Sequence, residues 1–142
     1  MKVNYENIPQ TLKEMPNWVV WKAEQRDGRI TKVPYDALTN HRAESNNRST
    51  WSPFETAVHT LENSNYDGLG IMLSDGLVGV DLDDVEEEIK EYQAGGYNIV
   101  TDFVERLQSY AEISPSGTGI HIIVRGTLPP TGRRRGNVEM YN

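Results

Sequence analysis

Short apolar runs recur along this 142-residue chain, and in several of them apolar and polar residues alternate with a period of two, a pattern typical of half-buried β-strands. The runs at residues 18–22 and 30–36 flank an Asp-Gly pair, which predicts a β-hairpin. The runs at residues 68–73 and 77–83 flank the tripeptide Ser-Asp-Gly and predict a second hairpin. Further strands are expected at residues 120–126 and 137–142, on either side of a loop rich in Pro, Gly and Arg.

Two longer segments repeat their apolar residues at helical spacing, at 52–63 and 98–110. The first begins with Ser52, Pro53 and Glu55, which predict a capping box. A short helix is expected after Asn7 and should end before Pro16, while residues 39–50 are polar and predict a loop. Strands and helices mixed with hairpins indicate an α+β fold with a largely antiparallel or mixed sheet.

Length and composition predict one domain and exclude several classes of site. The chain contains no cysteine, so neither a disulfide framework nor a thiolate metal site can form. It has no run of about 18 apolar residues and no apolar segment near its first residues. We therefore expect a soluble, cytoplasmic protein with no membrane partner.

The net charge of −7 is concentrated in one segment. Residues 81–91 hold seven acids and one lysine, which leaves only −1 for the rest of the chain. Basic residues gather elsewhere, around Lys32, at Arg42, and at Arg133, Arg134 and Arg135. This distribution is what a metal site beside phosphate-binding loops would have, although charged loops in solvent are an equally common explanation of any one cluster.

Four ionisable residues follow the same rule of alternation. Asp81 and Asp83 share one side of their predicted strand, opposite its apolar residues, and His121 and Glu139 do the same in theirs. If the apolar sides share one core, three carboxylates meet on the other face and repel one another unless a cation neutralises them. The pattern predicts Asp81, Asp83 and Glu139 as ligands of two divalent ions about 4 Å apart. A single Asp-x-Asp is more often a turn or an exposed edge, so the combination carries the prediction.

The loop before His121 has the composition of a phosphate-binding loop. Glycines allow close approach to the backbone, hydroxyls supply donors, and His121 could donate to a phosphate oxygen. The same composition also describes a simple turn. The residues concerned are Ser114, Ser116, Gly117, Thr118 and Gly119.

The segments "VGVDLDD", "EISPSGTGIHIIVRG" and "VEMYN", with "WVVWK", "TKVPYD" and "STWSPFETA" upstream, resemble the N-terminal primase-polymerase domain of phage and mobile-element replication proteins, in the archaeo-eukaryotic primase superfamily. The resemblance implies metal ligands at Asp81, Asp83 and Glu139, and a phosphate contact at Gly119 and His121. It also implies one catalytic domain in which an N-terminal α/β unit (residues 1–66) joins an RRM-like sheet (residues 67–142). Because the family continues beyond its third motif, often into a helicase-like region, we expect a C-terminally truncated domain whose partner is such a region or a helicase.

The function implied is template-directed nucleotidyl transfer by a DNA polymerase, a primase or both, with Mg²⁺ or Mn²⁺ as cofactors. Its partners would be a DNA template and primer and nucleoside triphosphates, in a bacterial or phage-infected cell. His121 and Ser116, with Arg125 or Lys32, would stabilise developing charge, and Arg133, Arg134 and Arg135 would grip phosphates. Two alternatives stay open: a catalytically incomplete domain that binds single-stranded or origin DNA, and a metal-dependent nuclease.

Overall fold

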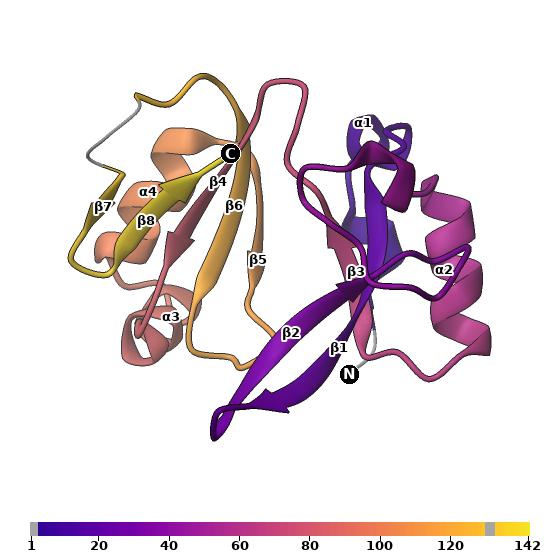
Figure 1. Ribbon diagram of the computed structural model, residues 1–142. Coiled ribbons are helices and arrows are strands. Elements are labelled where there is room, and N and C mark those ends of the chain that lie inside the picture. Colours follow the sequence, from indigo (N-terminus) through magenta and orange to yellow (C-terminus); the bar gives the residue numbers. More distant parts are fainter. Residues whose placement is uncertain (1–2, 130–132) are drawn as a thin grey trace. The chain divides into compact units, whose positions relative to one another are not determined.

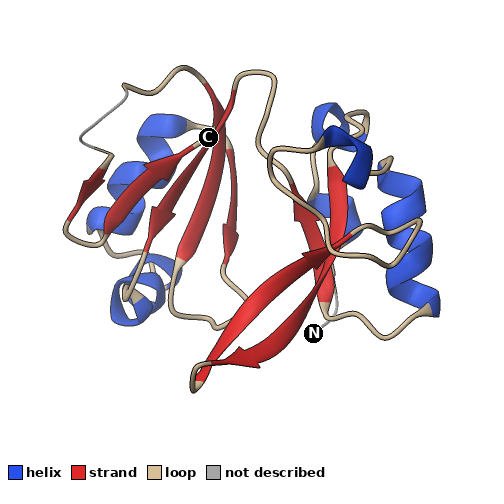
Figure 2. Ribbon diagram, in the orientation of Figure 1, coloured by secondary structure: helices blue, strands red, loops and turns tan. Residues whose placement is uncertain are grey.

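The computed structural model describes residues 3–129 and 133–142. The chain divides into two compact units, Met1–Met72 and Leu73–Asn142, each with its own β-sheet (Figures 1 and 2). Every strand pair in the described ranges is antiparallel, which confirms the predicted α+β class. The resemblance implies a division after residue 66, and the two compact units divide after Met72.

The first unit contains a three-stranded sheet in the order β2-β1-β3. β1 (Trp18–Arg26) and β2 (Arg29–Tyr35) form the predicted hairpin, and both residues of its turn, Asp27 and Gly28, have positive φ, as a two-residue type I′ turn requires. α2 (Phe54–Asn63) packs on this sheet, where Phe54 meets Trp18 edge-on at 4.9 Å between ring centroids. The other elements are η1 (Tyr5–Asn7), α1 (Gln10–Lys13) and η2 (Arg48–Thr50).

The second predicted hairpin is wrong. β3 (Gly68–Ile71) pairs with the free edge of β1, and β4 (Leu77–Leu82) lies in the other sheet. A short polar loop between two apolar runs is typical of a hairpin turn, but β3 pairs with β1, which lies about 50 residues earlier in the chain. The predicted capping box of α2 is also wrong, because the backbone of Ser52 exchanges two hydrogen bonds with Trp18, of 2.8 and 2.9 Å, and the helix starts after Pro53.

The second unit contains a five-stranded sheet in the order β5-β6-β4-β8-β7. Two helices, α3 (Glu86–Gln93) and α4 (Ile99–Leu107), cover one of its faces, and their apolar side chains meet those of β4 and β6 in the core. The other face carries the candidate site. The remaining strands are β5 (Tyr110–Ile113), β6 (Ile120–Arg125), β7 (Arg134–Arg135) and β8 (Val138–Tyr141).

Among the described residues of this unit, seven buried apolar residues form one core cluster that is contiguous across strands and helices. Alternation along β4 and β6 sends every second side chain into it, which leaves the residues between them on the open face. The core therefore fixes which residues the open face presents. Its members are Val80, Leu82, Val85, Ile89, Val100, Ile120 and Ile122.

Three elements of the second unit were not predicted: α3, β5 and β7. α3 was missed because most of its residues are charged, and only Val85, Ile89 and Tyr92 mark its apolar side. β7 lies inside the segment predicted as a Pro/Gly/Arg loop, of which residues 130–132 are outside the described residues. α4 ends at Leu107 instead of Tyr110, since Gln108 has positive φ. In the described ranges no helix has the length and apolar character needed to span a membrane.

Candidate functional site

One row of five side chains crosses the open face of the five-stranded sheet. Strand register pairs Glu112 with His121, His121 with Asp81, Asp81 with Glu139, and Glu139 with Arg134. Directly paired residues of antiparallel strands lie on the same face with their Cβ atoms about 5 Å apart. Three of the four residues singled out by alternation are thus brought into one row, with two neighbours that the alternation argument did not include.

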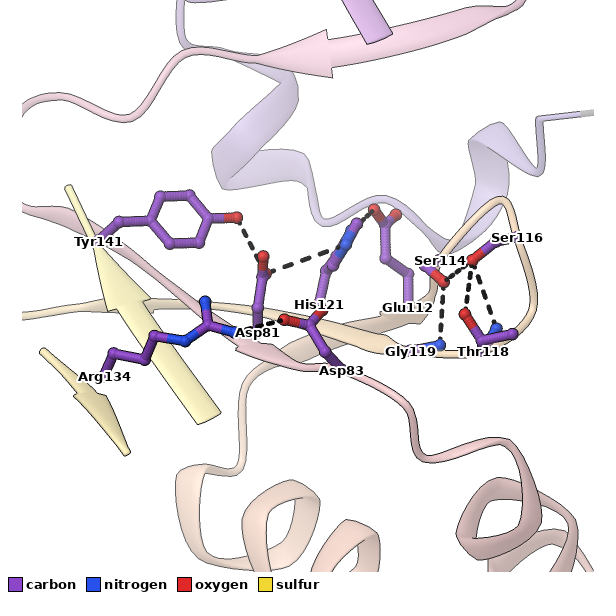
Figure 3. A network of polar contacts seen from close by, with 10 residues as sticks. All are labelled: Asp81, Asp83, Glu112, Ser114, Ser116, Thr118, Gly119, His121, Arg134 and Tyr141. Carbon is purple, nitrogen blue, oxygen red and sulfur yellow. Dashed lines mark hydrogen bonds and ion pairs between the residues drawn. The ribbon is translucent and has the colours of Figure 1, made fainter. Parts of the chain in front are cut away.

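Asp81 is the centre of this row and its most enclosed carboxylate, with 20% of its side chain exposed. Its Oδ1 accepts a hydrogen bond of 2.9 Å from the Tyr141 hydroxyl and lies 3.9 Å from Nε2 of His121 (Figure 3). Burial raises the pKa of Asp81, and the charges of Asp83 and Glu139 raise it further, while His121 and the Tyr141 hydroxyl oppose this rise. Additional positive charge nearby would therefore stabilise the ionised form of Asp81.

Tyr141 reaches Asp81 because Gly79 leaves room for its ring. A Cβ atom at Gly79 would lie 2.7 Å from Cζ of Tyr141, closer than any real contact. Burial, followed by the neighbouring charge of Asp81, raises the pKa of the Tyr141 hydroxyl, so it remains a donor. The alternation pattern placed Tyr141 on the same face, two residues after Glu139, but indicated no role for it.

Asp83 and Glu139 share one cation, Arg134. Nη1 of Arg134 donates to Oε2 of Glu139 at 3.0 Å. Its Nη2 lies 4.0 Å from Oδ2 of Asp83 (Figure 3). Asp83 follows the last residue of β4, and its backbone N–H donates to the carbonyl of Asn137, which keeps it beside β8. All three predicted metal ligands therefore already have polar or ionic partners.

His121 lies between two carboxylates. Its Nε2 faces Asp81, and its Nδ1 lies 3.5 Å from Oε1 of Glu112 (Figure 3). The other oxygen of Glu112 accepts a hydrogen bond of 2.8 Å from the Tyr110 hydroxyl. Sequence reasoning missed Glu112 because β5 is a four-residue strand, too short to show clear alternation.

The loop from Ser114 to Gly119 is held by its own hydroxyls. Oγ of Ser116 lies 3.0 Å from Oγ of Ser114 and 2.9 Å from Oγ1 of Thr118, and Oγ of Ser114 accepts from the Gly119 N–H at 3.0 Å (Figure 3). Gly117 has positive φ. A Cβ at Gly119 would lie 2.7 Å from the Leu82 carbonyl, so that glycine is required by close packing on β4.

The other predicted site residues are dispersed. Arg125 is exposed at the end of β6, on the same side of the strand as His121. Arg133 donates to the carbonyl of Pro129 and to Oδ1 of Asn142, while Arg135 is exposed. Lys32 belongs to the other unit, where its ammonium lies 4.9 Å from the centre of the Trp21 ring.

The acidic segment 81–91 separates into two parts. Glu86, Glu87 and Glu88 occupy the first turn of α3, where negative charge is favourable beside the positive end of the helix dipole. Asp81 and Asp83 alone come from β4 and its end. Most of the predicted acidic locus is therefore the surface of a helix.

The donor chemistry of the site fits a hard divalent cation, because carboxylate oxygens are the ligands that Mg²⁺ and Mn²⁺ prefer. No group of three or more His, Asp or Glu side chains in residues 3–129 and 133–142 is already arranged around a common point for a metal ion. A cation would have to draw Asp81, Asp83 and Glu139 away from Tyr141 and Arg134.

The chain is similar in sequence to a phage DNA primase-polymerase, which confirms the resemblance indicated by the motifs. The relative is the DNA Primase-polymerase of Nitratiruptor phage NrS-1, which is 35% identical over 122 residues. The match covers 84% of this chain but only 16% of the relative, so the chain spans about a sixth of that protein's length. A comparison with known family models gave no match.

Proposed function

We propose that this chain carries the nucleotidyl-transfer site of a template-directed DNA polymerase or primase in phage or mobile-element replication. The observation that carries the proposal is the row on the open face, in which Asp81 is paired with both His121 and Glu139. The similarity to a relative named as a DNA primase-polymerase supports the same function. The substrates would be a DNA template and primer with nucleoside triphosphates.

Asp81, Asp83 and Glu139 would hold Mg²⁺ or Mn²⁺, which when bound activates a 3′-hydroxyl and neutralises the triphosphate. Side chains of the chain itself would bind and orient the phosphates. Nε2 of His121 faces the site, and an N–H there can donate a hydrogen bond to a phosphate oxygen. The hydroxyls of Ser114, Ser116 and Thr118 can exchange their mutual hydrogen bonds for phosphate oxygens.

A purely DNA-binding role is less well supported. Modules that bind single strands on a sheet stack the bases on exposed aromatic rings. Here the row consists of charged groups, and the hydroxyls of two tyrosines beside it, Tyr110 and Tyr141, are bonded to Glu112 and Asp81. A nuclease could use the same carboxylates, so the test has to distinguish synthesis from cleavage.

The test follows a labelled primer on a template, and a template without primer, with Mn²⁺ and dNTPs. We expect extension by the wild-type chain and a loss of more than about 100-fold in Asp81→Asn/Asp83→Asn, since residues that merely support metal ligands already cost about 10- to 100-fold. The matched control is Asp84→Asn, because Asp84 is exposed and has a positive φ that asparagine also accepts. Shortening of the primer would identify a nuclease, and metal-independent binding without turnover would overturn both enzymatic functions.

A further inference from the structure

The three candidate ligands need positive charge even when no metal is bound, because carboxylates on one face repel one another. For two of them the chain supplies that charge itself. Arg134 contacts Glu139 through Nη1 and Asp83 through Nη2, so its planar guanidinium connects the carboxylates on the β8 side of the site. We propose that Arg134 is the resident counter-ion of the metal site and that a divalent cation binds by displacing its guanidinium from Asp83 and Glu139. This inference rests on the proposed function.

Local structure places Arg134 for this role. β7 is only two residues long, and Gly136, which has positive φ, turns the chain so that Arg134 lies opposite Glu139 in β8. The next arginine pairs with Val138 and so lies on the other side of the ribbon. Of the three consecutive arginines, it is therefore Arg134 that the register directs at the carboxylates.

The contacts of Arg134 are suited to exchange. Its side chain is 58% exposed, and those of Asp83 and Glu139 are 48% and 41% exposed. Exposed ion pairs contribute little to stability, because water and salt screen them. A divalent cation can therefore replace the guanidinium without leaving it buried and unpaired.

The opposite expectation is that Arg134 serves only to grip a phosphate of DNA or nucleotide, as the composition of its loop predicts. In that case its removal would weaken ligand binding and leave the affinity for a bare metal ion unchanged. Metal binding in the absence of DNA and nucleotide separates the two roles.

The experiment titrates Mn²⁺ into the full chain by isothermal calorimetry at low ionic strength, without DNA or nucleotide. We expect Arg134→Gln to bind Mn²⁺ about two- to fivefold more tightly than wild type, the range that corresponds to losing an exposed ion pair. Arg134→Lys should lie between them, because lysine keeps the charge but not the two-pronged geometry. The matched control, Arg135→Gln, should have wild-type affinity.

Two further readouts are independent of activity. The difference in Mn²⁺ affinity between Arg134→Gln and wild type should become smaller at about 1 M salt, because the Debye length there is about 3 Å. In EDTA the melting temperature of Arg134→Gln should fall below that of Arg135→Gln, and saturating Mn²⁺ should narrow this gap.

Unchanged or weaker Mn²⁺ binding by both Arg134 variants would overturn the inference. Failure of the wild-type chain to bind Mn²⁺ would overturn it together with the metal site. Normal Mn²⁺ binding with no primer extension would overturn the proposed polymerase function alone and leave the role of Arg134 intact.

Discussion

Glu112 determines how His121 presents its ring to the candidate site. Nδ1 of His121 faces a carboxylate oxygen of Glu112, whose second oxygen is held by the Tyr110 hydroxyl. A carboxylate beside one ring nitrogen holds the orientation of a histidine ring, so the other nitrogen is aimed in a defined direction. We infer that Glu112 is a positioning residue for His121 and does not itself touch the substrate.

Replacing Glu112 with alanine should therefore raise the KM for the incoming nucleotide by about tenfold with a smaller change in kcat, if His121 binds phosphate oxygens. Glu112→Gln should recover most of this loss, because an amide oxygen can still accept from Nδ1. Steady-state kinetics on a fixed primer-template measure both constants, with Glu105→Gln on the exposed side of α4 as the control. Equal kinetics for Glu112→Ala and wild type would exclude the positioning role.

At the scale of elements, the strands β4 and β8 are matched in shape as well as in register. Gly79 of β4 accepts the ring of Tyr141 from β8, and this contact brings the Tyr141 hydroxyl to Asp81. A side chain at position 79 would therefore disturb a hydrogen bond two residues away. The hydrogen bond between Tyr141 and Asp81 thus depends on Gly79, a residue with no functional side chain of its own.

Gly79→Ala should lower the free energy of unfolding by about 1–3 kcal/mol, since the added methyl group overlaps the Tyr141 ring and approaches Leu73 to 3.0 Å. Denaturant unfolding in EDTA measures the change, and near-UV circular dichroism reports the environment of the ring. Gly126→Ala is the control, because a Cβ there meets no atom within 4 Å. If both alanine variants unfold alike, the close packing of Tyr141 on Gly79 is not a constraint.

Strand alternation was sufficient to place Asp81, His121 and Glu139 on one face, because β4, β6 and β8 each show enough alternation to reveal their two sides. It could not place Glu112 or Arg134, whose strands are four and two residues long. α3 was not predicted because its glutamates, which are favourable in the first turn of a helix, leave few apolar residues to show helical spacing. The position of β3 depended on pairing with a strand far away in the sequence, which no local pattern records.

At the scale of the whole molecule, the candidate metal site is contained in one compact unit. Its three carboxylates, His121 and Arg134 all lie in Leu73–Asn142, which has a core of its own. Lys32 is the one predicted site residue that lies in Met1–Met72. Metal binding should therefore depend on Leu73–Asn142 alone, whereas catalysis should also involve Met1–Met72 through Lys32.

The fragment of residues 73–142 should consequently fold by itself and bind Mn²⁺ with about the affinity of the full chain. It should melt at a lower temperature, because a 70-residue domain buries a smaller share of its surface than the full chain does. Circular dichroism melting and Mn²⁺ calorimetry of the fragment beside the full chain measure both properties. Arg134→Gln in the fragment should again tighten Mn²⁺ binding, because its ion-pair partners are all present. A folded fragment that binds Mn²⁺ at least tenfold more weakly would mean that Met1–Met72 contributes to the metal site, contrary to the division seen here.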